Sequence, residues 1–372
     1  MKLAVDIHHL LLENAGTKRV TVNLLEQLKK ATEINLLEFK PEYTLKQKAG
    51  IIGKIQSHFI RLFWVQIHLP YLCWINKVDI LLSPEFNTPL FTTCKRAVIV
   101  HDAHMRAQRK YTSSLWFYFY YIPFVEFAIR HANLIFTVSN FAKTQIVRFM
   151  RLNEKKVQVV YNGLDKSFLN INGINKEDIK LPEGLISNNY ILFVGTFETR
   201  KNIERLIQAF SKVKQSNPAT DHIKLAIAGG SSASKFSDRS NQISSLIGQL
   251  NLGNEIVLCG YIADIDLPHL YQNSLLIAFP SLYEGFGLPI IEGFASCVPV
   301  LTSNICSMPE IAGDAAVLAD PYDINDLAEK IEKIIFDPVL RSELIAAGNK
   351  RLRFFSWEKS AAQITHSLTQ LL

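Results

Sequence analysis

The chain has 372 residues, enough for two domains that each bury a full core, and 48% of its residues are hydrophobic. The formal net charge of +6 is unevenly placed: residues 1–170 carry 23 Lys and Arg against 12 Asp and Glu, and residues 171–372 carry 17 against 22. A basic first half suits an anionic membrane face, a pyrophosphate-linked molecule or a plain solvated surface. No DNA- or RNA-binding motif accompanies the charge, so we expect no nucleic-acid partner.

The five cysteines form no C-x-x-C pair and are odd in number. This pattern favours reduced thiols and argues against a zinc site. The N-terminal residues MKLAVDIHHLL lack the apolar core of a signal peptide and predict instead a first β-strand that ends at Asp6. We therefore expect a cytoplasmic protein.

Short apolar runs alternate with helical patterns along the chain, which predicts two series of βα units. In the first half, strand-like runs end at Asp6, His101, Ser139 and Asn162, with helical patterns at Val20–Leu28 and Phe141–Met150. The polar segment Asn170–Asn189 then interrupts the pattern as a linker would. A second series of strands is predicted at Tyr190–Val194, Ile223–Ala228, Ile256–Leu258, Leu275–Phe279, Pro299–Thr302 and Ala316–Leu318. We predict an α/β protein with two doubly wound parallel sheets that face each other across a cleft.

Two aromatic-rich segments, Phe59–Ile75 and residues 114–130, lie in the basic half. Charged residues and prolines interrupt both, so neither meets the requirement of roughly 20 apolar residues for a membrane-spanning helix. We expect core helices in both places. Their Trp, Tyr and Phe side chains beside Lys and Arg leave open an interfacial face that meets a lipid-linked molecule.

His101 and Asp102 directly follow the apolar run in AVIVHDAHMR, residues 97–106. They are predicted at the carboxyl end of a strand, where open α/β sheets bind ligands. A lone histidine at such a position is usually structural, and Asp102 could orient its imidazole.

The segment ILFVGTFETRKNIERLIQAF, residues 191–210, predicts a strand, a turn with Gly195 and Thr196, and a helix whose opening holds Arg200 and Lys201. Cations are disfavoured at a helix N-terminus unless an anion compensates them, so this pair favours a bound diphosphate. A solvated basic turn is the alternative. Two later strands end in glycine, in AIAGGS (226–231) and LCGYIAD (258–264), and either could leave room for a nucleotide or be a plain loop.

The most informative segment is SLYEGFGLPIIEGFASCVPVLTSNICSMPEIAGD, residues 281–314. It places Glu284 in the loop at the carboxyl end of the strand Leu275–Phe279. Gly285 and Gly287 let the backbone approach a ligand, and a helix that begins near Leu288 would aim N–H groups and its positive dipole end at a phosphate. Glu292 follows about one turn later. Two solvated glutamates at a helix start are the alternative.

With Pro309 and Glu310 following in order, this segment resembles the retaining, nucleotide-sugar-dependent glycosyltransferases of the GT-B fold, the glycosyl transferases group 1 family. This branch includes glycogen synthase and many bacterial mannosyltransferases. The resemblance covers nearly the whole chain and includes the family's R-K-N element at 200–202, its N-G-(I/V)-D element at 162–165 and its FSW hinge at 355–357. It implies an acceptor-binding domain, residues 1–172 with a returning helix at 357–372, and a nucleotide-sugar-binding domain, residues 173–356.

The resemblance also implies roles for particular residues in an enzyme that needs neither a metal nor a cofactor. Arg200 and Lys201 would stabilise the leaving diphosphate in place of a metal, Glu284 would bind sugar hydroxyls, Glu292 the ribose, and His101 the sugar or the acceptor. The catalytic set is His101, Arg200, Lys201 and Glu284. The implied donor-binding set is Gly16, Thr196, Arg200, Lys201, Tyr261, Glu284, Gly285, Phe286, Gly287, Leu288 and Glu292.

The reaction implied is hexose transfer, with retention, to a hydroxyl of a glycan or lipid-linked acceptor in cell-surface polysaccharide biosynthesis, such as that of lipopolysaccharide. GDP-mannose is the favoured donor, because the His-Asp pair looks most like that of bacterial mannosyltransferases, and UDP- and dTDP-sugars stay open. A cytoplasmic enzyme peripheral to the inner face of the plasma membrane would fit. The alternatives are a sugar-nucleotide epimerase or a glycan phosphorylase on the same fold, or a non-catalytic protein that binds sugar nucleotides.

Two positions depart from the family pattern. Lys18 stands where relatives often carry the second glycine of G-I-G-R, which leaves acceptor binding near that loop open, although Lys18 and Arg19 could hold a phosphate. Cys297 stands where the family commonly has the glycine of A-C-G-x-P. We expect its side chain to cost some packing freedom without touching the carboxylates.

Overall fold

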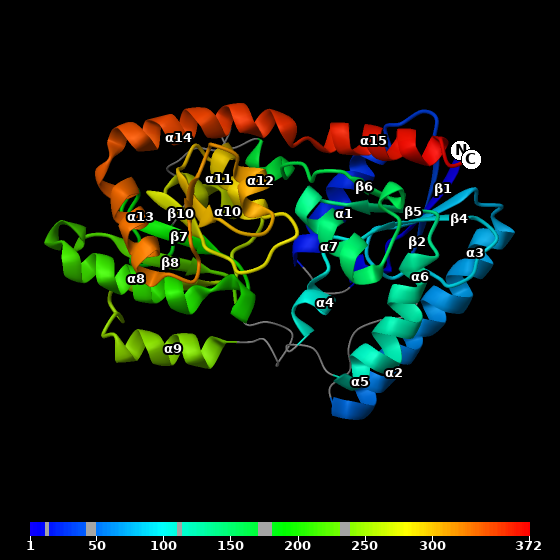
Figure 1. The fold of residues 1–372 in the computed structure, drawn as a ribbon, viewed down its shortest axis with the longest axis horizontal. Helices are drawn as coiled ribbons and strands as arrows, with labels where there is room; N and C mark the ends of the chain where they lie inside the picture. Colours follow the sequence, from blue (N-terminus) through cyan, green and yellow to red (C-terminus); the bar gives the residue numbers. More distant parts are fainter. Residues whose placement is uncertain (12–14, 42–49, 110–113, 170–180, 231–238) are drawn as a thin grey trace. The chain divides into compact units, whose positions relative to one another are not determined.

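The chain divides into two compact units (Figure 1), each built on a six-stranded parallel sheet. The computed structural model describes residues 1–11, 15–41, 50–109, 114–169, 181–230 and 239–372. Unit 1 comprises residues 1–163 and 356–372, and unit 2 comprises residues 164–355. The predicted class, α/β with two doubly wound parallel sheets, is confirmed. The predicted boundary between residues 172 and 173 lies outside the described residues.

The sheet of unit 1 has the strand order β2-β1-β3-β4-β5-β6, and every neighbouring pair is parallel. Its strands are β1 (Lys2–Asp6), β2 (Asn35–Phe39), β3 (Ile80–Ser83), β4 (Lys95–Ile99), β5 (Leu134–Thr137) and β6 (Val157–Val159). Strand β2 lies on one side of β1 and β3 lies on the other, so the strand order reverses at β1. Ligands of doubly wound sheets bind at the carboxyl ends of the strands beside such a reversal.

The helices of unit 1 cover this sheet, and the last helix of the chain is one of them. They are α1 (Ala15–Leu28), α2 (Gly50–Phe63), α3 (Leu69–Ile75), α4 (His104–Ala107), α5 (Ser114–Trp116), α6 (Phe127–Arg130), α7 (Asn140–Met150) and α15 (Trp357–Thr369), with π-helical stretches η2 (Trp64–His68) and η4 (Phe117–Glu126). None of the helices within the described ranges is long and apolar enough to cross a membrane.

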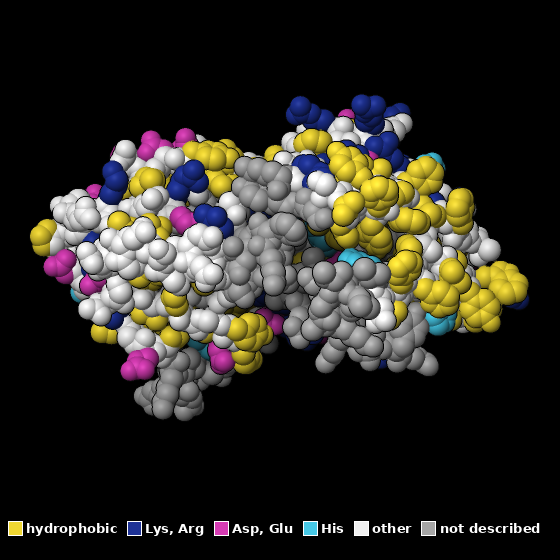
Figure 2. Space-filling model, turned by 90° about the horizontal axis from the view of Figure 1, so that it is seen from below, with side chains coloured by type: hydrophobic (Ala, Val, Ile, Leu, Met, Phe, Trp, Pro, Cys, Tyr) yellow, Lys and Arg dark blue, Asp and Glu magenta, His cyan; other side chains and the backbone are white. Residues whose placement is uncertain are grey.

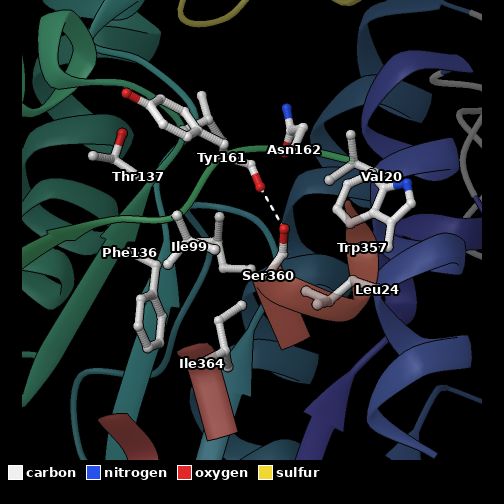
Figure 3. A pocket seen from close by; sticks show the side chains of 12 residues that line it. Val20, Leu24, Ile99, Phe136, Thr137, Tyr161, Asn162, Trp357, Ser360 and Ile364 are labelled. Atoms are coloured by element: carbon white, nitrogen blue, oxygen red, sulfur yellow. Dashed lines mark hydrogen bonds between the residues drawn. The ribbon is translucent and has the colours of Figure 1, made fainter. Parts of the chain in front are cut away.

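Helix α15 packs on α1 and on the sheet of unit 1, as Figure 3 shows from close by. The Ser360 hydroxyl donates a 2.6 Å hydrogen bond to the carbonyl of Tyr161, and a cavity of about 20 Å³ remains beneath the helix. A Cβ on Gly163 would lie 2.3 Å from the backbone nitrogen of Trp357. Glycine is therefore required at 163 because α15 approaches the backbone so closely.

The sheet of unit 2 has the order β12-β11-β10-β7-β8-β9 and is also parallel throughout. Its strands are β7 (Tyr190–Val194), β8 (Lys224–Ala228), β9 (Ile256–Gly260), β10 (Leu276–Phe279), β11 (Val300–Ser303) and β12 (Val317–Ala319). All six lie within two residues of the predicted positions, because continuous buried apolar runs mark them in the sequence. Here the strand order reverses between β7 and β10.

The helices of unit 2 connect these strands on both faces of the sheet. They are α8 (Ile203–Ser216), α9 (Ser240–Gln249), α10 (Leu267–Gln272), α11 (Leu288–Ala295), α12 (Met308–Ala312), α13 (Ile324–Phe336) and α14 (Pro338–Arg351). Helix α8 packs on α13, and α11 packs on α14. A Cβ on Gly293 would lie 2.6 Å from Val300 Cγ2, so glycine lets α11 settle closely on β11.

Candidate active site

The strand reversal of unit 2 brings together the two segments that carry its charged motif residues. The turn after β7 leads into a short 3-10 turn, η9 (Thr199–Lys201), which holds Arg200 and Lys201. The loop after β10 holds Glu284. The two loops are joined directly, since the backbone N–H of Leu282 donates to the carbonyl of Arg200 at 2.7 Å. The carboxyl ends of β7 and β10 therefore form one edge, where a doubly wound sheet binds its ligand.

Arg200 and Lys201 both donate to a single oxygen of Glu284. The Arg200 Nη1 to Glu284 Oε1 distance is 2.9 Å, and the Lys201 Nζ to Glu284 Oε1 distance is 2.7 Å. Arg200 Nε also pairs with Glu198 at 2.7 Å. The Lys201 ammonium lies 5.0 Å from the centroid of the Phe279 ring, and its side chain is 12% exposed. The cluster thus holds two largely buried cations around one shared carboxylate oxygen.

Burial perturbs the two central groups of this cluster. Burial lowers the pKa of Lys201, and the neighbouring Arg200 guanidinium lowers it further, so the attraction of Glu284 does not restore the ordinary value. Burial raises the pKa of Glu284, but Lys201 and Arg200 outweigh it and the pKa lies below its ordinary value. The Lys201 ammonium is therefore incompletely neutralised, and an added anion would stabilise it.

The conformation of this cluster differs from prediction in one respect. Arg200 and Lys201 precede helix α8 rather than opening it, because Asn202 takes a left-handed conformation with φ +62°. The Asn202 side chain, 2% exposed, donates to the carbonyls of Pro280 and Pro321 at 3.0 and 2.7 Å. Asn202 thereby fixes the η9 turn to the strand ends β10 and β12, which the R-K-N pattern alone does not explain.

The glycine-rich loop around Glu284 is held from behind by residues that the sequence analysis does not single out. The Ser307 hydroxyl, fully buried, lies 2.9 Å from the carbonyl of Glu284 and 2.8 Å from that of Phe286. The Ser303 hydroxyl donates to the carbonyl of Ser281 at 2.6 Å. Helix α11 begins at Leu288 as predicted, with Gly287 at φ +109° before it. The loop is thus a rigid feature whose shape needs glycine at 287.

Glu292 lies in helix α11 as predicted, but it is 2% exposed. Its carboxylate accepts a hydrogen bond of 2.7 Å from the hydroxyl of Tyr271, a residue of α10 that is itself fully buried. Tyr271 was not anticipated, because its approach to α11 depends on tertiary packing that no local pattern records. The ribose contact expected of Glu292 stays a prediction.

The other predicted donor-binding positions of unit 2 lie along the same edge of its sheet. Gly229, after β8, has φ +131°, and a Cβ there would lie 1.9 Å from the carbonyl oxygen of Gly195. The β7 and β8 turns therefore pack backbone against backbone, which only glycine allows. Thr196 is exposed, and Tyr261, which follows β9, is 76% exposed. Gly285, Phe286 and Gly287 are buried, whereas Leu288 is half-buried.

The strand reversal of unit 1 gathers a second group of ionisable residues. Asp6 ends β1, and it accepts hydrogen bonds from His8 Nδ1 at 2.8 Å and from Trp64 Nε1 at 3.1 Å. His9 Nε2 lies 2.8 Å from the Thr21 hydroxyl. His8 and His9 are each 1% exposed, and His8 Nε2 has no hydrogen-bond partner among the described residues. A buried Asp-His pair therefore leaves one imidazole nitrogen unused.

His101 lies in the loop after β4 and is bonded to the loop after β3. His101 Nε2 donates to the carbonyl of Pro84 at 3.1 Å, which fixes Nδ1 as the acceptor in the neutral imidazole. The next residue is Glu85, which is 8% exposed and has no hydrogen bond or ion pair among the described residues. Burial lowers the pKa values of His9 and His101, and the Glu85 carboxylate partly opposes the shift in both.

Asp102 does not hydrogen-bond to His101. Its carboxylate instead accepts from the backbone N–H of His104 at 2.8 Å, although its charge also opposes the lowered pKa of His101. Glu85 is the site residue that the sequence analysis misses, and its signal was a carboxylate directly after the apolar run Ile80–Ser83. Gly16, also in unit 1, lies in the first turn of α1, and a Cβ there would meet nothing within 4 Å.

Comparison with known families matches both halves of the chain. Residues 176–351 match the family described as Glycosyl transferases group 1, and residues 15–168 match Glycosyltransferase Family 4. The second half of the chain is thus a Glycosyl transferases group 1 domain, and the first half is a Glycosyltransferase Family 4 domain. Its two parallel six-stranded sheets are those of the GT-B fold.

Individual relatives agree with this assignment. The chain is 31% identical over 232 residues to the Escherichia coli O-antigen chain mannosyltransferase B, covering 62% of this chain and 59% of that protein. It is 27% identical over 297 residues to the Escherichia coli serotype-specific mannosyltransferase WbdA, covering 78% of this chain but only 34% of WbdA. Among solved structures, Anabaena HepE in complex with UDP and glucose has a TM-score of 0.70 at 17% identity, covering 99% of both chains.

Proposed function

We propose that this protein is a retaining hexosyltransferase that moves mannose from GDP-mannose to a hydroxyl of a glycan or lipid-linked acceptor in cell-surface polysaccharide biosynthesis. The Glycosyl transferases group 1 domain and the relation to O-antigen mannosyltransferases support this assignment. The observation that carries it is the convergence of Arg200 and Lys201 on one oxygen of Glu284 at the strand reversal of unit 2.

The cation pair is suited to a diphosphate leaving group. Charge grows on the diphosphate as the sugar departs, and fixed cations in a partly buried site stabilise that charge at little reorganisation cost. Lys201 uses one of its N–H donors for Glu284, and its pKa is lowered mainly by burial, so additional negative charge nearby would stabilise its ammonium. A diphosphate would supply that charge, so no metal is required in the proposed reaction. Glu284 would then be free to accept from hydroxyls of the sugar.

The edge of unit 1 is suited to the acceptor. Glu85 is a nearly buried carboxylate with no hydrogen-bond partner among the described residues, and its charge acts on His9 and His101. The carboxylate oxygens of Glu85 remain accessible to solvent, so an acceptor hydroxyl could donate to them in place of water. We therefore place the acceptor hydroxyl between Glu85 and His101 Nδ1. A cytoplasmic location, with contact to the inner face of the plasma membrane, completes the proposal.

The test is release of nucleoside diphosphate by the purified protein. GDP-mannose, UDP-glucose and a dTDP-sugar are each supplied with a glycan acceptor, with and without EDTA. We expect GDP release that depends on the acceptor and survives EDTA, and an α-linked product that retains the donor's configuration by NMR. Lys201→Ala should lose about 10²-fold or more in turnover. Lys212→Ala is the matched control, since Lys212 lies in α8 and its hydrogen-bond partner among the described residues is the exposed Asn325.

Other outcomes identify what would replace the proposal. Release from a UDP- or dTDP-sugar would retain the transferase and change the donor. Conversion of the donor sugar without an acceptor would indicate an epimerase, and a need for inorganic phosphate would indicate a phosphorylase. Turnover by Lys201→Ala equal to that of the wild type would refute the role of the cation pair.

A further inference from the structure

Unit 1 carries a stripe of exposed apolar side chains along its longest helical segment. Helices α2 and α3 are joined without a break by the π-helical stretch η2, because the flanking residues Phe63 and Leu69 are themselves helical. One face of this segment is fully buried through Trp64, Leu69 and Cys73. The exposed residues recur at every fourth position and are Phe59 (67% exposed), Phe63 (50%), Ile67 (58%), Tyr71 (53%) and Ile75 (48%), with Trp74 (62%) beside them.

A second helical segment repeats this pattern. The segment α5–η4–α6 exposes Leu115 (73%), Tyr118 (61%), Phe119 (73%) and Phe127 (45%), while Phe117 and Tyr121 are buried. The two segments touch, since the rings of His58 and Tyr120 lie 5.6 Å apart between centroids. Figure 2 shows hydrophobic side chains gathered over this part of unit 1. We call the exposed residues of the two segments the aromatic face.

The aromatic face has cations but no exposed acid. Residues 50–77 contain no Asp or Glu at all. In the second segment the single acid is Glu126, which is 1% exposed and bound by Arg106 at 2.7 Å and by Arg130 at 2.5 Å. Arg61 and Lys77 have no ion-pair partner among the described residues. Exposed Trp, Tyr and Phe beside unpaired cations are the composition that lies at the interface of an anionic bilayer.

This charge pattern argues against a second copy of the chain as the occupant. A two-fold dimer would place the same face on both sides of the interface, so its cations would meet cations and find no acid. An anionic phospholipid surface, in contrast, complements both the apolar side chains and the cations.

The aromatic face is also attached to the carboxyl edge of the sheet in unit 1. Trp64, from the buried side of the first segment, donates to Asp6 at 3.1 Å. Arg106, in the helix that follows His101, binds Glu126 of the second segment through two hydrogen bonds, of 2.7 and 2.9 Å. Both segments are thereby held to the loops that carry the candidate acceptor residues.

We propose that the aromatic face binds the surface of an anionic phospholipid bilayer and so holds the acceptor edge of unit 1 beside lipid-linked substrates. The proposal rests on the proposed function only for its second half, because the binding itself requires no catalysis. The Trp and Tyr rings would lie at headgroup depth and the Phe, Leu and Ile side chains deeper, with Arg61 and Lys77 against lipid phosphates.

The test is co-sedimentation of the full chain with vesicles, in the absence of any donor. Vesicles of phosphatidylglycerol and phosphatidylcholine are compared with vesicles of phosphatidylcholine alone. Two variants remove the face, Phe63→Ser with Trp74→Ser and Leu115→Ser with Phe119→Ser. The matched control is Phe336→Ser with Val339→Ser, since these residues of unit 2 are also exposed, at 47% and 66%. Circular dichroism and the melting temperature check that each variant is folded.

We expect the wild type and the control to bind the anionic vesicles, and each face variant to bind at least about tenfold more weakly. Absence of wild-type binding, or binding by both face variants equal to that of the control, would overturn the proposal. It would also be overturned if sedimentation velocity showed a wild-type dimer that the face variants dissociate, without any binding to vesicles. Vesicle binding without nucleotide release on any donor would retain this proposal and refute the proposed function.

Discussion

Replacement of Lys201 by methionine separates a ligand-binding role of the cation from a structural one. The ammonium lies 2.7 Å from Glu284 Oε1 and 5.0 Å from the centroid of the Phe279 ring, in a side chain that is 12% exposed. A methionine has similar length and is favourable against an aromatic ring. Glu284 would retain Arg200 at 2.9 Å, so the substitution leaves no unpaired carboxylate.

The expected effects on folding and on binding differ in size. Breaking a buried ion pair is costly mainly when it leaves one charge alone, and Lys201 already has a pKa lowered by burial. We therefore expect the free energy of unfolding to change by no more than about 1 kcal/mol. A charge-assisted hydrogen bond to a diphosphate contributes about 1.5–3 kcal/mol, so the dissociation constant of the nucleoside diphosphate should rise by about 10- to 150-fold.

Isothermal titration calorimetry with GDP measures the affinity, and urea unfolding measures the stability. Wild-type affinity in Lys201→Met would refute the diphosphate contact. A loss of several kcal/mol in stability would show that the ion pair with Glu284 is structural, and the loss of activity would then have another cause.

The lowered pKa of Lys201 also predicts how the affinity for GDP depends on pH. The pKa of Lys201 lies below its ordinary value in the free protein, and a bound diphosphate would raise it. The complex therefore binds more protons than the free protein between these two pKa values. Affinity for GDP should be greatest below the lower pKa and fall as the pH rises through it, by up to about tenfold per pH unit. Lys201→Arg should remove this dependence, because arginine stays protonated.

Four further substitutions test other parts of the protein. Glu292→Gln should weaken nucleotide binding. Tyr271→Phe, which removes the 2.7 Å hydrogen bond to the same carboxylate, should not weaken it; equal losses by calorimetry would assign Glu292 a packing role. Glu85→Gln should lower kcat/KM for the acceptor by about tenfold or more and leave donor affinity unchanged, and an unchanged acceptor KM and kcat would remove Glu85 from the site. Cys297→Gly should raise the free energy of unfolding by about 0.5–1 kcal/mol, measured by urea unfolding, because Cys297 holds a left-handed φ of +55° that glycine adopts freely.

The strands of unit 2 could be predicted because they are buried on both faces, and such strands are continuous apolar runs in the sequence. Of the two strands missed in unit 1, β2 lacks that signal, because it carries exposed Asn35 and Glu38 at the edge of the sheet. Strand β3 is fully buried and carries the signal, but its short run was overlooked. The expectation that the Cys297 side chain costs packing freedom stays a prediction, and the structure adds a separate backbone feature, a positive φ after helix α11.

The candidate site was predictable where its chemistry lies in one segment and unpredictable where it depends on a partner. The pair Arg200 and Lys201 was recognised as cations that need an anion, but the shared oxygen of Glu284 joins residues more than 80 positions apart. The hydrogen bond between Glu292 and Tyr271 could not be predicted at all, because the sequence around either residue carries no sign of it. Glu85 was missed for a related reason: it follows β3, a strand that the sequence analysis did not locate.

The positive charge of the first half of the sequence does not by itself predict a positive surface, because some of its cations are paired with acids. Arg106 and Arg130 contribute to that excess, yet both are bound to Glu126 and so add little field at the surface. What distinguishes the aromatic face is the absence of acids from residues 50–77. Arg61 and Lys77, which have no ion-pair partner in the described part of the chain, therefore add their full charge to this face. Each such cation near an anionic membrane contributes about 1 kcal/mol, whereas one buried large apolar side chain contributes about 1.5–3 kcal/mol. Membrane contact by this protein would therefore depend on its aromatic side chains for strength and on its few cations for the choice of lipid.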